Sequence, residues 1–185
     1  MFTFIIPSIR KDTLEYTIES VLAQTDPNWK AIVCGDGVCI PPFTDERILT
    51  IIAPKTNQSF TRNYAAKYAN TEWLVMLDDD DWVVPEYLEW FKPYTENSDI
   101  IVSQMNNYGN IIPIGPIIEH GQIGISFAVR RSVLLEFPFP SVASEDYVYL
   151  KTARDEAGYR ISFTNMCGYY VRKFLTDPNF IPTPL

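Results

Sequence analysis

The sequence contains little cysteine, only one histidine and no cluster of basic residues. Its cysteines, Cys34, Cys39 and Cys167, are an odd number without the spacing of a metal site, which indicates a reducing compartment and core-filling thiols. The net charge is −8, and because no group of lysines and arginines offsets it, this charge argues against a nucleic-acid partner. A small anion bound through a metal ion is compatible with the same charge.

Long hydrophobic runs are also absent. No apolar stretch is long enough to cross a bilayer, and residues 1–4 lack the basic start of a signal peptide, so we expect a cytoplasmic protein without a transmembrane segment. A length of 185 residues, of which 46% are hydrophobic, predicts one well-buried domain. Three prolines within residues 177–185 indicate a tail, or a linker to further domains on the C-terminal side.

Four consecutive aspartates follow a short apolar run near the middle of the chain. Trp73 to Leu77 is continuously apolar, as expected of a parallel strand that is buried on both faces. Asp78 to Asp81 then lie at the carboxyl end of that strand, the edge of a wound sheet at which ligands bind. Because adjacent carboxylates repel one another, we expect a hard divalent ion, Mg²⁺ or Mn²⁺, among them. The alternative is a solvated acidic loop before a helix that has Pro85 in its first turn.

Strands and helices alternate along most of the chain, a pattern typical of a wound α/β sheet. We predict strands at residues 2–7, where Pro7 ends the strand, and at 29–34, 48–52, 73–77, 99–105 and 126–129. Helices are predicted after an Asp12 N-cap, from a Ser59 cap to Ala69, and at 85–94, 131–136 and 145–158. Residues 106–125 are predicted to form a long functional loop or a pair of short strands.

Two further features lie at predicted turns and loops. Gly35 and Gly37 flank Asp36 after the second predicted strand, and glycine there permits a tight turn or a close approach of the backbone to a ligand. His120 lies in the glycine-containing segment 106–125. A polar surface role is the favoured interpretation of this histidine, over contact with a metal ion or a phosphate.

Taken in order, these motifs resemble those of the family 2 glycosyltransferases, which have the GT-A fold. Ile5-Ile6-Pro7-Ser8 is similar to the family's first strand and nucleotide loop, and Cys34-Gly35-Asp36-Gly37 to its Asp-Asp-Gly-Ser turn. The other matching segments are Thr61-Arg62-Asn63, similar to an Ala-Arg-Asn segment, Asp78-Asp79-Asp80, similar to the Asp-x-Asp metal motif, and Ser144-Glu145-Asp146-Tyr147, similar to a late Glu-Asp motif. The turn departs from the family pattern at Gly35 and Val38. The resemblance covers residues 2–160 and implies a Rossmann-like wound mixed sheet flanked by helices.

The resemblance implies an inverting, metal-dependent enzyme that moves a sugar from a nucleoside-diphosphate sugar, expected to be a UDP-sugar, to a hydroxyl group of a glycan or another acceptor. The residues expected to bind the nucleotide are Pro7, Ser8, Ile9, Arg10, Asp36, Arg62, Asn63, Asp78 and Asp79. Asp80 would be the direct ligand of Mn²⁺ or Mg²⁺, with Asp78 in the ribose or metal shell. Asp146 would be the general base that acts on the acceptor, with Glu145 as the alternative. A GT-A domain of residues 1–176 would comprise a nucleotide-binding half, residues 1–105, and an acceptor and catalytic half, residues 106–176.

Other interpretations of the same residues stay open. Arg62 fits a surface helix as well as an ion pair with the Asp run or the diphosphate, and Glu145 and Asp146 fit ordinary helix capping. A sugar nucleotidyltransferase would share the metal requirement, but Ser8-Ile9-Arg10-Lys11 lacks the glycines of that class's loop. A non-enzymatic module that binds a divalent ion or a sugar would use the Asp run as a calcium site and would bind no nucleotide.

Overall fold

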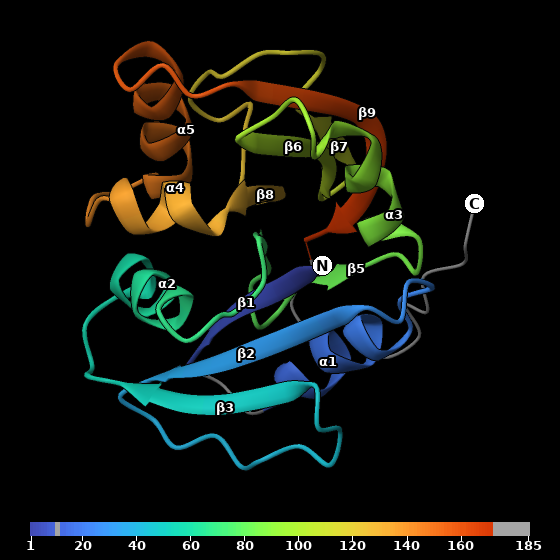
Figure 1. The fold of residues 1–185 in the computed structure, drawn as a ribbon, viewed down its shortest axis with the longest axis vertical. Coiled ribbons are helices and arrows are strands. Elements are labelled where there is room, and N and C mark those ends of the chain that lie inside the picture. Colours follow the sequence, from blue (N-terminus) through green and yellow to red (C-terminus); the bar gives the residue numbers. More distant parts are fainter. Residues whose placement is uncertain (10–11, 172–185) are drawn as a thin grey trace.

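The computed structural model describes residues 1–9 and 12–171, which form one mixed β-sheet with helices packed against it (Figure 1). The strand order is β3-β2-β1-β4-β8-β6-β9-β5, and β7 pairs with β6. The strands are β1 (Phe2–Ser8), β2 (Trp29–Asp36), β3 (Ile48–Ala53), β4 (Trp73–Met76), β5 (Trp82–Val83), β6 (Ile100–Asn107), β7 (Asn110–Ile112), β8 (Phe127–Arg130) and β9 (Ile161–Tyr170). The predicted wound α/β sheet in a single domain is thus confirmed. Arg10 and the predicted tail, residues 177–185, lie outside the described residues.

Five α-helices and one 3-10 helix occur among the described residues. They are α1 (Leu14–Leu22), α2 (Gln58–Ala66), α3 (Tyr87–Phe91), η1 (Lys92–Tyr94), α4 (Arg131–Glu136) and α5 (Glu145–Asp155). Figure 1 shows α1 and α2 beside β1, β2 and β3, whereas α4 and α5 lie with β6, β8 and β9 on the other side of the molecule. The two groups of elements correspond to the N-terminal and C-terminal parts of the chain.

The parallel part of the sheet places the Asp run at its carboxyl edge. Strands β3, β2, β1 and β4 are parallel, with Ile5 opposite Ile32 on one side and Met76 on the other. The chain leaves β1 through α1 toward β2 and returns through α2 from β3 to β4. Since such crossovers are right-handed, the two helices cover opposite faces of the sheet. The carboxyl ends of β1 and β4 therefore meet where the strand order reverses, which is where open α/β sheets bind ligands.

The first strand continues through Pro7 to Ser8, so the prediction that Pro7 ends it is wrong. The carbonyl of Ile5 accepts the Leu77 N–H on the β4 side, and residue 7 turns its backbone nitrogen to the same side. Because β4 ends at Met76, no partner carbonyl of the ladder is left unpaired by the missing N–H of proline. Pro7 remains in register with Cys34 of β2.

The helix N-caps differ from the predicted ones by one or two residues. Thr13, not Asp12, is the N-cap of α1, and it makes no side-chain cap bond. Asn57, not Ser59, caps α2 by accepting the Phe60 N–H at 2.9 Å. Both stretches offer several capping side chains, and the backbone angles at the helix start decide among them.

The C-terminal part of the sheet contains two strands that the sequence did not reveal. Strand β9 runs parallel to β6 for most of its ten residues, and β5, directly after the Asp run, pairs antiparallel with the end of β9. The rings of Trp82 and Tyr170 stack at a centroid distance of 4.2 Å. In segment 106–125 the structure forms one short strand, β7, against β6. The end of β9 thus lies beside the residues that follow the aspartates.

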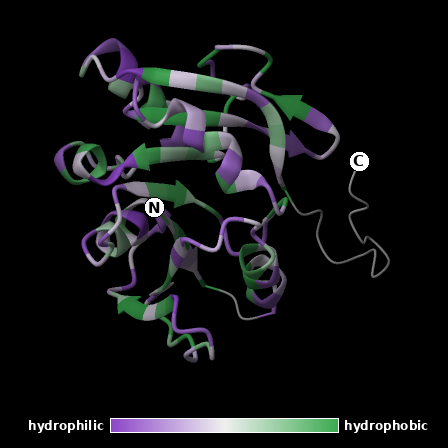
Figure 2. Ribbon diagram, turned by 45° about the vertical axis from the view of Figure 1, so that its right-hand side comes forward, coloured by the Kyte–Doolittle hydropathy of each residue, from purple (hydrophilic) through white to green (hydrophobic). Residues whose placement is uncertain are grey.

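The hydrophobic core follows the strands. Most of the strongly hydrophobic colour in Figure 2 lies on the strands, and Phe4, Ile5 and Leu74 are fully buried. Cys34 is buried and Cys167 is half-buried, but Cys39 is exposed, so the core-filling interpretation is wrong for Cys39. None of the described helices has the length and apolar character that crossing a bilayer requires.

Candidate active site

The four aspartates form a tight turn at the end of β4. The Asp81 N–H donates to the Asp78 carbonyl at 3.3 Å, so the chain doubles back within the run. Asp78 and Asp80 are half-buried and line a cavity, as does the buried Asp81. Asp79 is buried on the β1 side, where its Oδ2 accepts the Ser8 hydroxyl at 2.7 Å and the Ile9 N–H at 3.1 Å. The run thus holds the end of β1 with one carboxylate and presents others to the cavity.

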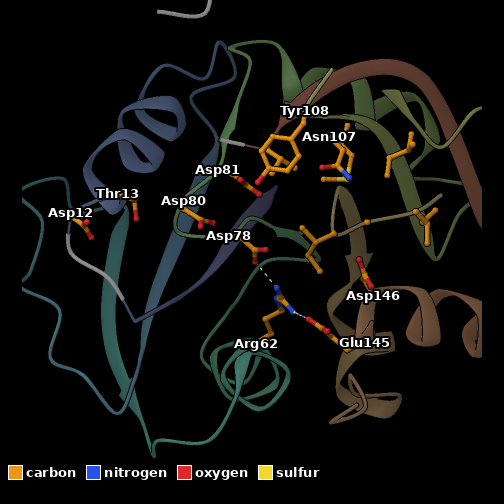
Figure 3. Close-up of a pocket in the computed structure, with 16 residues that line it drawn as sticks. Asp12, Thr13, Arg62, Asp78, Asp80, Asp81, Asn107, Tyr108, Glu145 and Asp146 are labelled. Carbon is orange, nitrogen blue, oxygen red and sulfur yellow. Dashed lines mark hydrogen bonds and ion pairs between the residues drawn. The ribbon is translucent and has the colours of Figure 1, made fainter. Parts of the chain in front are cut away.

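A cavity of about 560 Å³ lies between the Asp run and α5 (Figure 3). Its acidic lining residues are Asp12, Asp78, Asp80, Asp81, Glu145 and Asp146. Arg62 is the one basic side chain in the described lining, and the rest of the wall is mainly apolar, with Met105, Ile112, Ile123, Ile125 and Val171 beside Asn107 and Tyr108. Six carboxylates against one guanidinium produce a negative potential, which repels a diphosphate unless a cation accompanies it.

Arg62 joins the two acidic walls of this cavity. From α2 its Nη2 lies 2.6 Å from Asp78 Oδ1 and its Nη1 lies 2.7 Å from Glu145 Oε1. The side chain is 1% exposed, which excludes the surface-helix interpretation. Burial alone would lower the pKa of the guanidinium, but the charge of Asp78 and the hydrogen bond to Glu145 outweigh it, so the pKa rises and the charge is permanent. Arg62 therefore takes the first of its two predicted partners, a carboxylate of the Asp run.

Glu145 and Asp146 open α5 and have different surroundings. Ser144 precedes them in the left-handed region (φ 54°, ψ 45°), a costly conformation for a residue other than glycine. Burial raises the pKa of the Asp146 carboxyl above its ordinary value, and the charges of Glu145 and Asp78 add to the rise, while the Tyr147 N–H and Arg62 oppose it. A carboxylate with a raised pKa is a stronger base, which suits Asp146 for taking a proton. Asp146 also caps its own helix, since Oδ1 accepts the Tyr147 N–H at 2.7 Å.

Several predicted nucleotide-binding residues make contacts within the protein and do not line this cavity. The Asp36 Oδ1 accepts the Thr56 N–H at 2.6 Å. The side-chain amide of Asn63 makes two hydrogen bonds with the backbone of Phe139. Its Nδ2 donates to the Phe139 carbonyl at 2.9 Å, and its Oδ1 accepts the Phe139 N–H at 3.0 Å. The other such residues are Pro7, Ser8, Ile9 and Asp79, at the β1 end described above. Their roles toward a nucleotide stay predictions.

The two glycines of the turn, Gly35 and Gly37, have no room for a side chain. A Cβ on Gly35 would clash with the Val38 carbonyl oxygen, and a Cβ on Gly37 would clash with the Lys55 side chain. Gly37 also has φ +70°, which a residue with a side chain rarely adopts. Both glycines are therefore required by close approach of the chain to itself.

The donor set of the cavity fits a divalent cation that is shared with substrate. Asp78 and Asp80 offer oxygen ligands, and across residues 1–9 and 12–171 no three carboxylate, imidazole or thiol groups are arranged to hold a metal ion by themselves. Mg²⁺ commonly takes one or two protein carboxylates and completes its shell with water and substrate phosphates. A site of that kind needs no third side chain from the protein.

Sequence reasoning missed some residues of the site. Asn107, the last residue of β6, and Tyr108, in the turn before β7, line the cavity, and Tyr108 has a positive φ of 53°. Tyr169, from the unpredicted β9, makes hydrogen bonds to Asp78 and Asp81 through its hydroxyl group. His120 is not a lining residue; its Nε2 lies 3.0 Å from Ser144 Oγ and its ring packs edge-on against Tyr147. The glycines of segment 106–125 were the available signal in the sequence for a functional turn.

The mixed sheet with its reversed strand order has the GT-A fold. The chain belongs to the family described as glycosyl transferase family 2, whose pattern matches residues 3–142. The predicted family and class of enzyme are thereby confirmed. Family membership also decides against the sugar nucleotidyltransferase and the ion-binding module.

Three similar proteins illustrate the match. The UDP-Glc:alpha-D-GlcNAc-diphosphoundecaprenol beta-1,3-glucosyltransferase WfgD of Escherichia coli is 28% identical over 94% of this chain and 76% of its own length. An uncharacterized glycosyltransferase of Haemophilus influenzae is 34% identical over 98% of this chain and 64% of its own length. The crystal structure of S. aureus TarS 1-349 in complex with UDP has a TM-score of 0.73 at 19% identity, covering 91% of this chain and 59% of that one. The chain is thus shorter than each of these relatives.

Proposed function

We propose that this protein transfers a sugar from a UDP-sugar to an acceptor hydroxyl with inversion of configuration, assisted by Mn²⁺ or Mg²⁺. The observation that carries the proposal is the cavity in which the Asp78 and Asp80 carboxylates lie opposite Glu145 and Asp146, with Arg62 between the two pairs. UDP as the nucleotide is supported by the name of the E. coli relative and by the ligand in the TarS complex.

The proposed metal site consists of Asp80 and Asp78. A bound cation would neutralise the negative charge that develops on the departing diphosphate. Arg62 restrains Asp78 at 2.6 Å, so that this carboxylate keeps one orientation toward the ligand. The acidic cavity supports metal dependence because it repels a free diphosphate.

Asp146 is the proposed general base. Glu145 is engaged by the permanent charge of Arg62 at 2.7 Å, whereas burial raises the pKa of the Asp146 carboxyl. Asp146 would take the proton of the acceptor hydroxyl as that oxygen attacks the anomeric carbon on the face opposite the diphosphate. A single displacement of this kind inverts the configuration at that carbon.

The acceptor is proposed to be a saccharide carried on a lipid diphosphate. The name of the E. coli relative gives such an acceptor for that protein. In this chain, Ile112 lines the cavity, and the segment around it exposes the apolar side chains of Ile111, Ile114 and Ile117. Exposed apolar groups beside a polar cavity fit an acceptor that has both a sugar and a lipid part.

The test is a screen of UDP-sugars for UDP release, with Mn²⁺ or with a chelator, and with a free or a lipid-linked saccharide as acceptor. Metal-dependent release from at least one UDP-sugar, stimulated by the lipid-linked acceptor, is the expected result. Asp155→Asn serves as the matched control for Asp146→Asn, because Asp155 is an exposed carboxylate at the other end of the same helix. UDP release that persists in chelator would refute the metal requirement. Equal rates with the free and the lipid-linked saccharide would refute the proposal that the acceptor carries a lipid.

A further inference from the structure

The hydroxyl group of Tyr169 binds both ends of the turn formed by the four aspartates. It donates to Asp81 Oδ2 at 2.6 Å and accepts the backbone N–H of Asp78 at 3.2 Å. Asp78 and Asp81 are also the first and last residues of that turn, joined by their own backbone hydrogen bond. The phenol therefore closes the turn a second time, from the side of the core.

The ring of Tyr169 is fixed by the strands around it. Its backbone pairs with Val83 of β5, directly after the Asp run, and with Met105 of β6. The ring packs edge-on against Tyr87 at a centroid distance of 6.5 Å, and a Cβ on the preceding Gly168 would clash with Trp90. A ring held this tightly carries its hydroxyl group to one place.

The Tyr169 hydroxyl acts on the aspartates from outside the cavity. Tyr169 is fully buried and is not among the residues that line the cavity. Any effect on donor binding must therefore pass through the aspartates.

We propose that Tyr169 is a positioning residue for the donor site, whose hydroxyl group sets where the carboxylates of the Asp78–Asp81 turn stand toward a metal ion and a diphosphate. This inference rests on the proposed function, because it assigns those carboxylates to the metal-diphosphate complex. A charge-assisted hydrogen bond at one end of a four-residue turn limits how far the two residues between its ends can move. Without the hydroxyl group, Asp78 and Asp80 sample more orientations and hold the cation less well.

The chain offers a matched control for this hydroxyl group. Tyr87 is also fully buried, touches the Tyr169 ring, and bonds Ser103 Oγ through its hydroxyl at 2.8 Å. Tyr87→Phe and Tyr169→Phe therefore remove the same atom from the same cluster, but only Tyr169 contacts the Asp run. If both hydroxyl groups had a purely structural role, the two variants would change UDP affinity equally.

The experiment titrates UDP binding by calorimetry at several Mn²⁺ concentrations, with thermal unfolding to confirm that each variant is folded. For Tyr169→Phe we expect UDP affinity to fall by about 5- to 30-fold and the Mn²⁺ concentration for half-maximal binding to rise. Tyr87→Phe should stay within about twofold of the parent protein. In an Asp81→Ala background, Tyr169→Phe should have a smaller effect than in the parent protein, because only the hydrogen bond from the Asp78 N–H is then left to lose.

Equal effects of the two phenylalanine variants, or a full additional effect in the Asp81→Ala background, would overturn the inference while leaving the proposed function intact. A parent protein that binds no UDP in Mn²⁺ would overturn the proposed function, and the inference with it. If Tyr169→Phe does not fold, Asp81→Asn weakens the same bond from its other end. That variant should show the same rise in the Mn²⁺ requirement, and an unchanged requirement would overturn the inference.

Discussion

Replacing Asp146 with asparagine should separate chemistry from binding. Asparagine keeps an oxygen that can accept the Tyr147 N–H at the start of α5, so the helix cap survives, but the amide cannot accept a proton from an acceptor hydroxyl. Loss of a general base slows the chemical step by about 10²- to 10⁴-fold. We therefore expect kcat of Asp146→Asn to fall by about that factor while UDP affinity stays near that of the parent.

The raised pKa of Asp146 adds two expectations to this variant. The parent rate should fall as pH drops through the raised pKa, because the base becomes protonated, and Asp146→Asn should lack this acidic limb. The folded state binds the Asp146 proton more tightly than the unfolded state, so its favourable contribution is complete at low pH and is lost as pH rises through the folded pKa. At neutral pH the ionised carboxylate therefore costs stability, and the variant should unfold at the same temperature as the parent or higher.

The assays are UDP release with acceptor across pH, UDP calorimetry and thermal unfolding. Glu145→Gln tests the other carboxylate of the pair and should have the milder effect on kcat. If Glu145→Gln is inactive and Asp146→Asn retains activity, Glu145 is the general base in place of Asp146. If both variants keep their activity, the Glu-Asp pair is only a helix cap and the base lies elsewhere.

Three further outcomes are expected. Chelation of divalent ions, or Asp80→Ala, should abolish UDP binding in calorimetry, and tight binding in chelator would contradict the charge argument. Asp36→Ala should weaken UDP binding by about 1 to 3 kcal/mol, the cost of losing the buried hydrogen bond that Asp36 is expected to make to the nucleotide, while Mn²⁺ affinity is unchanged. An unaltered UDP affinity would place the nucleotide pocket elsewhere. Arg62→Met should lower the free energy of unfolding in urea by about 3 kcal/mol, the lower end of the range for a broken buried ion pair. The low end applies because Asp78 and Glu145 are 21% and 20% exposed and can regain water; a loss below about 1 kcal/mol would refute this reasoning.

Local patterns in the sequence located the parts of the fold that local chemistry determines. The apolar run before Asp78 predicted a strand buried on both faces, and β4 is that strand. The N-caps were less predictable, since Asp12 and Thr13 both have capping side chains and only the backbone angles distinguish them. Strand β5 has two residues, too few for any period to show, and its pairing with β9 depends on residues that are far away in the sequence.

The sequence located those parts of the candidate site in which neighbouring carboxylates by themselves indicate a chemical role. The Asp run and the Glu-Asp pair meet in one cavity, as the resemblance implied. The contacts of Arg62 with Glu145 and of Asn63 with Phe139 join residues that are 83 and 76 positions apart, and no local pattern encodes them. The same holds for Tyr169, whose bond to Asp81 spans 88 positions.

The double ion pair of Arg62 also bears on how new acceptor specificities could be built in this scaffold. Its guanidinium comes from α2, and its partners come from the turn after β4 and from the first residue of α5. A chimera that exchanges the C-terminal part of the chain must therefore bring a carboxylate at position 145, or leave a buried cation half-neutralised. Crossovers after residue 145 keep the bridge intact, but they also retain the segment 106–125, which contributes residues to the cavity wall. Recombination of acceptor specificity is therefore best done with two junctions, before residue 106 and before α5.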